Sequence, residues 1–208
     1  ALRYSSPVNS QTGMASYHVV LHEPYTLDKL HHQARGGVKK GLANFQVEQI
    51  PFERLAEEGW ALQQDTLDRQ GRLKSMDQDE WRKICLAACN LPGFEAWSAI
   101  SCGELAAAQI IARVGNTACV PYAVSHRKYL CNHVNNVLFF TVSKNLLSRP
   151  GITNIFYCLH SLDAPTSVDQ FKNRMNLIFK PVLQRVVFHP MLTPFITDQS
   201  YQLIQYLS

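Results

Sequence analysis

The spacing of hydrophobic positions along the chain separates helical segments from strand-like ones. Apolar residues spaced by three and four predict helices over residues 24–45, 51–72, 76–90, 129–148 and 167–179. Alternating or continuous apolar runs predict strands over residues 16–24, 45–50, 94–100, 106–114, 117–124, 154–161 and 180–190. The pattern of residues 196–208 fits a helix or a strand. The chain is therefore predicted to be an α/β protein.

Glycines and the order of elements add detail to this prediction. Gly36-Gly37 predicts a kink in the first helix, because glycine weakens a helix interior. Residues 94–124 are predicted to form a three-stranded meander with hairpin turns. The strand at 154–161 is apolar enough to be buried on both faces. A long helix precedes it, and such a crossover implies a locally parallel strand pair.

Composition and charge bound the class of protein. With 208 residues, 46% of them hydrophobic and 17% charged, the chain is long enough to bury a sizeable core as one domain, residues 1–208. Residues 1–24 are expected to be a leading strand or the end of a preceding half. The net charge of +4 is small for a nucleic-acid binder and suits a small anionic ligand such as a nucleotide or coenzyme.

The cysteines and the N-terminus indicate a cytoplasmic protein. Most of the six cysteines lie in apolar segments, which is typical of reduced, buried thiols. Cys85 and Cys89 share a helix face, but no nearby Cys/His pair completes a zinc site, so no metal is expected. The N-terminus lacks the apolar core of a signal peptide, and no apolar run is long enough to predict a membrane span.

Three stretches resemble segments of a known superfamily. RGGVKKGLANFQVEQI is similar to its basic helix and following strand, CGELAAAQIIARVGNTACVPYAVSHRKY to its hairpin strands, and SVDQFKNRM to its helix with an FK pair. With the order of elements over residues 16–190, they resemble the GNAT superfamily of acyl-CoA transferases. The resemblance is strongest to the branch related to Fem-type aminoacyl transferases, in which two such folds are joined.

This resemblance implies both a fold and an activity. The fold would be a mixed, mostly antiparallel sheet with a central parallel strand pair and flanking helices. The activity would be transfer of an acyl or aminoacyl group from acyl-CoA, or from tRNA, to a small-molecule or peptide amine, without a metal. In typical acetyltransferases of the superfamily, a glycine-containing loop holds the donor pyrophosphate at the position of the turn SHRKY, which has no glycine here.

The turn SHRKY, at the start of the long helix, is the candidate donor-binding site. Free N–H groups at a helix start attract phosphate, and Arg127 and Lys128 add positive charge. The residues expected to bind the donor are Ser125, His126, Arg127, Lys128 and Tyr129. The alternative is a solvated turn in which Ser125 serves only as a helix N-cap.

Two asparagines extend this candidate site along the helix. Asn132 and Asn136 are spaced by four residues, so they would lie on one helix face. Asparagine is a poor helix former, which makes a cluster of polar residues here unexpected on propensity alone. They are predicted to line the donor pocket or, alternatively, to form a polar face in solvent.

His160 and Ser161 are the candidate catalytic residues. They are the last two residues of the predicted strand 154–161, and ligands of α/β proteins bind at such carboxyl ends of strands. Amide formation needs a base that takes a proton from the amine, and histidine has a suitable pKa. Tyr157 would point to the opposite face of the strand. The alternative is a histidine that is merely hydrogen-bonded at a strand end.

Two further functional readings stay open at this point. The first is a non-catalytic protein of the same fold that binds a ligand or a partner. The second is an RNA-binding module that uses a basic patch on the first helix, made of His31, His32, Arg35, Lys39 and Lys40. Asp65 and Asp68 are interpreted as ordinary charges on a helix surface.

Overall fold

The computed structural model describes residues 2–10, 13–22, 24–72, 75–160, 166–189 and 191. The strands are β1 (Leu2–Ser6), β2 (Met14–His22), β3 (Gln46–Ile50), β4 (Phe94–Ser101), β5 (Glu104–Val114), β6 (Thr117–Ser125), β7 (Asn154–Leu159) and β8 (Ile178–Val187). The helices are α1 (His32–Asn44), α2 (Phe52–Glu58), α3 (Trp60–Arg69), α4 (Gln78–Ala88), α5 (Val134–Leu147) and α6 (Thr166–Arg174). Two 3-10 helices, η1 (Leu27–Lys29) and η3 (Arg127–Asn132), complete these elements. The predicted α/β class is confirmed.

The strands form a sheet in the order β1-β8-β2-β7-β6-β5-β4-β3. The meander β4-β5-β6 is antiparallel throughout, and β3 pairs antiparallel with β4. β6 and β7 are parallel, as the crossover through α5 predicts. This mostly antiparallel sheet with one parallel pair is the sheet expected of a GNAT-like fold.

The chain forms two compact units. The first comprises Ala1–His18 and Lys180–Ser208, where β1 pairs antiparallel with β8 from Leu2 opposite Val187 to Ser6 opposite Leu183. The second comprises Val19–Phe179 and contains α1 to α6. All candidate site residues that the structure describes belong to the second unit.

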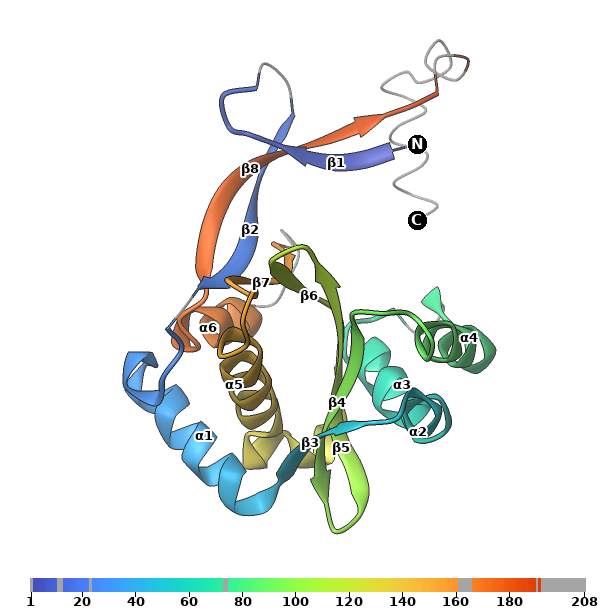
Figure 1. Ribbon diagram of the computed structural model, residues 1–208, viewed down its shortest axis with the longest axis vertical. Coiled ribbons are helices and arrows are strands. Elements are labelled where there is room, and N and C mark those ends of the chain that lie inside the picture. The colour runs from blue at the N-terminus through green and yellow to red at the C-terminus, as the bar shows by residue number, and fades with distance from the viewer. Residues whose placement is uncertain are drawn as a thin grey trace. The chain divides into compact units, whose positions relative to one another are not determined.

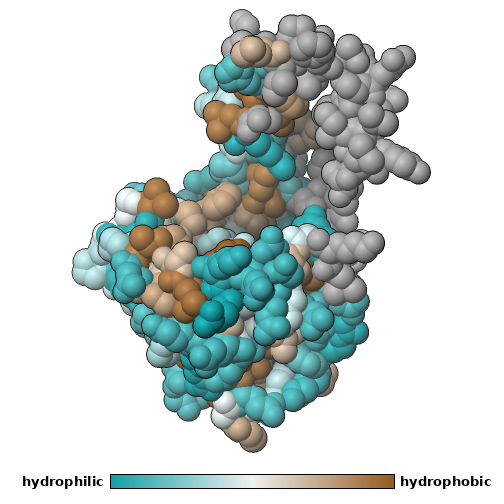
Figure 2. Space-filling model, turned by 90° about the vertical axis from the view of Figure 1, so that its right-hand side faces the viewer, coloured by the Kyte–Doolittle hydropathy of each residue, from teal (hydrophilic) through white to brown (hydrophobic). Residues whose placement is uncertain are grey.

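Helices cover both faces of the sheet in the second unit (Figure 1). α1 and α5 lie on one side of β3 to β6, and α2, α3 and α4 lie on the other. Each side has its own hydrophobic core, with Leu138, Phe139 and Ile155 in the first and Leu55, Leu62 and Trp81 in the second. The side that carries α4 is mostly hydrophilic, with scattered apolar residues (Figure 2). No helix among the described residues has the length and apolar character that crossing a bilayer requires.

Several predicted boundaries are wrong for identifiable reasons. α1 runs unbroken through Gly36-Gly37, so the predicted kink is absent. The single helix predicted over residues 51–72 is divided at Gly59 into α2 and α3. A β-carbon at Gly59 would lie 2.4 Å from the Leu55 carbonyl oxygen and 3.2 Å from Trp81, so this close approach requires glycine. In β7 only Ile155 is fully buried, and the other residues keep partial exposure.

Candidate functional site

A proline and a bulge separate the carboxyl ends of β6 and β7. The two strands pair only from Thr117 opposite Asn154 to Cys119 opposite Phe156, although β6 continues to Ser125. The register between β5 and β6 shifts just beyond Cys119, where β6 contributes an extra residue. Pro121 stands there, and its lack of an N–H suits a bulge and not a continuous ladder. Ligands of α/β sheets bind beyond strand ends that part in this way.

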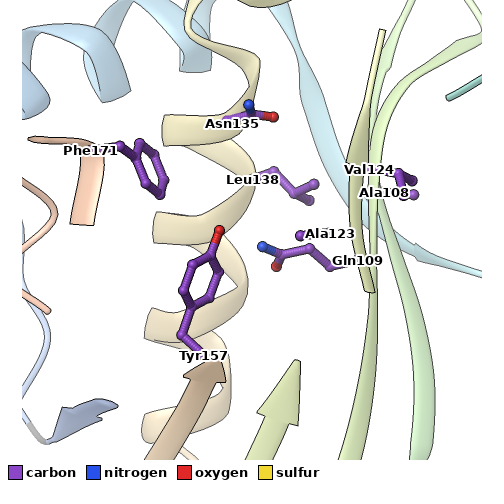
Figure 3. A pocket seen from close by; sticks show the side chains of 8 residues that line it. All are labelled: Ala108, Gln109, Ala123, Val124, Asn135, Leu138, Tyr157 and Phe171. Carbon is purple, nitrogen blue, oxygen red and sulfur yellow. The ribbon is translucent and has the colours of Figure 1, made fainter. Parts of the chain in front are cut away.

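A cavity of about 60 Å³ lies between these strands and α5 (Figure 3). Its lining residues come from five elements: Ala108, Gln109, Ala123, Val124, Asn135, Leu138, Tyr157 and Phe171. The side chains of Gln109 and Tyr157 point toward each other across it. A cavity of this volume has room for a few groups the size of a water molecule.

Three polar side chains in this cavity make no hydrogen bond to the residues that the structure describes. Within the described part of the chain, no hydrogen bond satisfies the amide of Gln109, the amide of Asn135 or the hydroxyl of Tyr157, and Gln109 is only 4% exposed. Burial raises the pKa of Tyr157, so its hydroxyl keeps its proton and can donate. The cavity is therefore equipped to bind a small polar group.

The turn SHRKY has a different geometry from the predicted one. Ser125 is the buried last residue of β6, and His126 caps η3 by accepting the Lys128 N–H at Nδ1 over 3.2 Å. The alternative, in which Ser125 serves only as the helix N-cap, is therefore wrong. α5 begins only at Val134, after the left-handed residue His133 (φ 60°).

The basic groups of this turn are already paired with carboxylates of the chain. The Arg127 N–H donates to Asp65 Oδ2 over 2.5 Å, and the Arg127 Nε donates to Asp65 Oδ1 over 2.6 Å. Arg127 Nη2 also pairs with Asp68. Lys128 Nζ and the Tyr129 hydroxyl both donate to Glu104 Oε2 over 2.8 Å. The turn is thus not simply solvated, and a donor-binding role for its residues stays a prediction.

Asp65 is buried rather than exposed, contrary to its interpretation as a surface charge. Its side chain is 8% exposed, and Arg69 Nε lies 3.6 Å from its Oδ1. Burial alone would raise the pKa of this carboxyl, but the hydrogen bonds and charge of Arg127 outweigh burial and hold the pKa below its ordinary value. Arg69 also donates to the Ser125 carbonyl over 2.8 Å, which fixes the end of β6 to α3.

The two predicted asparagines do not share a helix face. Asn132 ends η3, and the left-handed His133 separates it from α5, so the spacing of four residues does not place it beside Asn136. Asn136 Nδ2 contacts Met175 Sδ at 3.4 Å. The asparagine that lines the cavity is their neighbour Asn135. A donor-binding role for Asn132 and Asn136 stays a prediction.

His160 belongs to a charged cluster between β7 and α6. Its Nδ1 lies 3.5 Å from Asp169 Oδ1, and its ring packs edge-on against Phe179 with centroids 5.5 Å apart. Asp169 also pairs with Lys172 at 3.1 Å, and the Lys172 side chain is 3% exposed. His160 is not among the residues that line the cavity. Ser161 lies outside the described residues.

Sequence reasoning missed three polar residues that the fold buries: Gln109, Lys172 and Asp65. Gln109 stands in the apolar run AAAQIIARV, where one polar residue was a usable signal. A buried lysine is costly without a counter-ion, and Asp169 three residues earlier is the local hint for Lys172. No local pattern marks Asp65. In the described ranges, no group of three His, Cys, Asp or Glu side chains is placed to hold a metal ion.

Comparisons with known proteins bear on the fold. No protein-family model matches the sequence, and no curated protein matches it. Among solved structures, FemX matches with a TM-score of 0.66 at 11% identity, over 92% of this chain and 67% of FemX. A protein assigned as a lysylphosphatidylglycerol synthetase from Agrobacterium fabrum matches through its C-terminal domain, with a TM-score of 0.55 at 12% identity, over 83% of this chain and 61% of that one.

A shorter protein shares the same core. A protein described as a possible acetyltransferase from Clostridium difficile 630 matches with a TM-score of 0.52 at 12% identity, over 62% of this chain and 88% of that one. The chain thus covers 67% of FemX and 61% of the synthetase structure, about two thirds of each. The shorter protein matches only 62% of this chain. Together with the strand order and the parallel pair β6–β7, these matches show that the protein shares the fold of these structures, a GNAT-like fold.

Proposed function

We propose that the protein transfers an acyl or aminoacyl group from a CoA or tRNA donor to an amine acceptor. The observation that carries this proposal is the cavity where β6 and β7 part, which holds three polar side chains without a hydrogen bond to the described residues. The names of the similar structures support it, because one is described as a possible acetyltransferase and another is assigned as a lysylphosphatidylglycerol synthetase. The acceptor would be a small-molecule or peptide amine.

The cavity offers hydrogen-bond donors suited to such a transfer. The amine nitrogen attacks the carbonyl carbon of the donor, a C–N bond forms, and the bond from carbon to the leaving sulfur or oxygen breaks. Negative charge develops on the carbonyl oxygen, and the Tyr157 hydroxyl and the Gln109 amide can both donate to it. Removing one such donor typically costs a factor of about 10²–10³ in turnover.

His160 is proposed as the general base for the attacking amine, acting through a water, because its side chain does not line the cavity that holds Tyr157 and Gln109. It follows the end of β7, three residues beyond Tyr157, and Asp169 can stabilise the imidazolium that forms when it takes the proton. Lys172, bound to the same Asp169, adds a buried positive charge to this cluster. Ser161 stays a catalytic candidate that rests on the sequence alone.

The test is turnover with acetyl-CoA and with aminoacyl-tRNA, followed by mass spectrometry of the amide product on a panel of amines. Tyr157→Phe and Gln109→Leu should each lower turnover about 10²-fold. Tyr4→Phe, in β1 of the other unit, is the matched control and should leave turnover unchanged. Unchanged turnover in both cavity variants would rule out this site.

The base assignment has its own test. His160→Ala should abolish turnover while donor binding, measured by calorimetry, is retained. If turnover is unaffected, His160 is not the base. Donor binding without turnover in the unmodified protein would instead support the non-catalytic, ligand-binding alternative.

A further inference from the structure

The turn after β6 contains a set of donors that converge on one carboxylate. The Arg127 N–H and Nε reach the two oxygens of Asp65 over 2.5 and 2.6 Å, and Arg69 Nε lies 3.6 Å from one of them. His126 Nδ1 is 3.3 Å from the other oxygen, but it accepts the Lys128 N–H and so is not available as a donor there. One backbone N–H and two guanidinium groups are the donors that also bind phosphate.

Asp65 is held in this position by its own helix. It lies on α3 one turn before Arg69, and its side chain is 8% exposed. Thr66, the next residue of α3, accepts the Ser125 N–H over 3.0 Å. α3 is thereby tied to the end of β6. The Asp65 carboxylate is therefore held by the fold among the Arg127 N–H and the Arg127 and Arg69 guanidinium groups, a donor set that we call the Arg127 cradle.

The cradle is accessible from solvent, yet its charge is already neutralised. It borders a surface groove of about 440 Å³ lined by Ala61, Gln64, Asp65, Asp68, His126 and Arg127. The Arg127 side chain is 53% exposed, so an external anion can approach it. Such an anion would meet two guanidinium groups balanced by two carboxylates, and it would have to displace Asp65 to reach the backbone N–H.

We propose that Asp65 is a specificity-determining residue that occupies the phosphate position of this turn and closes it to external phosphate. The inference refines the proposed function by excluding donor phosphates from the Arg127 cradle while Asp65 fills it. A donor is then recognised through the cavity between β6 and β7 and through contacts outside this cradle. Replacing Asp65 with a small neutral residue should open an anion site that the native protein lacks.

The experiment is thermal unfolding and calorimetry with inorganic pyrophosphate and, separately, acetate, against chloride at matched ionic strength. The native protein should show no saturable effect. Asp65→Ala should be destabilised and then regain stability saturably with either anion, with a rise in Tm of about 5 °C or more at one hundred times the dissociation constant. Adding Arg127→Ala to Asp65→Ala should abolish this rescue.

Two further variants make the result decisive. Asp65→Asn keeps the size of the side chain, removes its charge and should gain anion binding in the same direction, even if Asp65→Ala does not fold. Asp68→Ala removes the exposed carboxylate on Arg127, leaves the cradle filled and should gain none. Saturable pyrophosphate binding by the native protein that Arg127→Ala removes would overturn the proposal, and so would the absence of rescue in both Asp65 variants.

These outcomes are independent of catalysis. Inorganic anions report on the cradle whether or not the protein transfers acyl groups. The turnover tests on Tyr157 and Gln109 can therefore fail while the closure of the turn by Asp65 stands. Conversely, the anion tests on Asp65 can fail while turnover still depends on Tyr157 and Gln109.

Discussion

The Asp65 side chain is only 8% exposed and is surrounded by hydrogen-bond donors. Its carboxylate receives the Arg127 N–H and guanidinium and lies near Arg69. An ion pair on a protein surface contributes little to stability, because both charges stay hydrated, but a buried carboxylate that loses its partners is costly. The ionised form of Asp65 is therefore the form that the fold requires.

This requirement predicts acid-sensitive stability. The pKa of Asp65 is lower in the folded state than the ordinary value of about 4, so the stabilisation is complete above that pH and is lost as pH falls through the folded value. The free energy of unfolding of the native protein should exceed that of Asp65→Asn by about 2 kcal/mol at neutral pH. Urea unfolding from pH 7 to pH 3 measures this difference, which should shrink in the acid range. A difference that does not vary with pH would contradict the role given to the charge.

The residue scale also shows why the candidate site was only partly predictable. Arg127 and Lys128 were correctly singled out as a basic turn, but their partners Asp65 and Glu104 lie 62 and 24 residues away in sequence. Nothing in the local pattern of α3 distinguishes Asp65 from an exposed helix charge. Tyr157 could be placed on the face opposite His160 from strand geometry, whereas its position in a cavity depends on the separation of β6 from β7.

At the scale of elements, α1 and α5 approach each other through glycine. A β-carbon at Gly37 would lie 2.9 Å from His133 Nδ1, and one at Gly41 would lie 2.6 Å from the Val137 β-carbon. Both glycines are buried on the side of α1 that faces α5. Their role is close packing, which explains why α1 continues through the glycine pair that predicted a kink.

Replacing glycine with alanine should change the free energy of unfolding in opposite directions at two positions of α1. Gly41→Ala should lower the free energy of unfolding by about 1–3 kcal/mol, because its methyl group overlaps Val137. Gly36→Ala should raise it by about 0.5–1 kcal/mol, because a β-carbon there has nothing within 4 Å and alanine favours the helix. Urea unfolding of the two variants tests this. Equal effects at both positions would contradict the packing account.

Element boundaries were predictable where the signal is local. Asp77 and Glu80 form a capping box at the start of α4, and Gly103 and Gly115 adopt positive φ in the hairpin turns. The start of α5 was not predictable in this way. His133 takes a left-handed conformation without being glycine, and its ring packs on Gly37 of α1, so this boundary depends on a tertiary contact.

At the scale of the whole molecule, the resolved architecture of the second unit is two cores on one sheet. Successive residues of β5 serve both cores, with Ala107 packed in the core of α1 and α5 and Ala108 in the core of α2, α3 and α4. Small side chains here let helices pack closely on each face. The fold class was predictable because apolar spacing along the chain indicates the order of meander, crossover helix and parallel strand. The separation of β6 from β7 was not, because it depends on the place of Pro121 at the register shift between β5 and β6.

Because the two cores share the same strands, loss of one should destabilise the other. Leu55→Ala removes a fully buried side chain from the core of α2, and Leu146→Ala removes one from the core of α5. Each should lower the free energy of unfolding by about 2–5 kcal/mol and leave the dependence on denaturant unchanged. Urea unfolding followed by tryptophan fluorescence and by far-UV circular dichroism should give coincident transitions in both variants, since Trp81 and Trp97 stand in different cores. A transition that splits in either variant would mean that the cores unfold separately and that the sheet does not couple them.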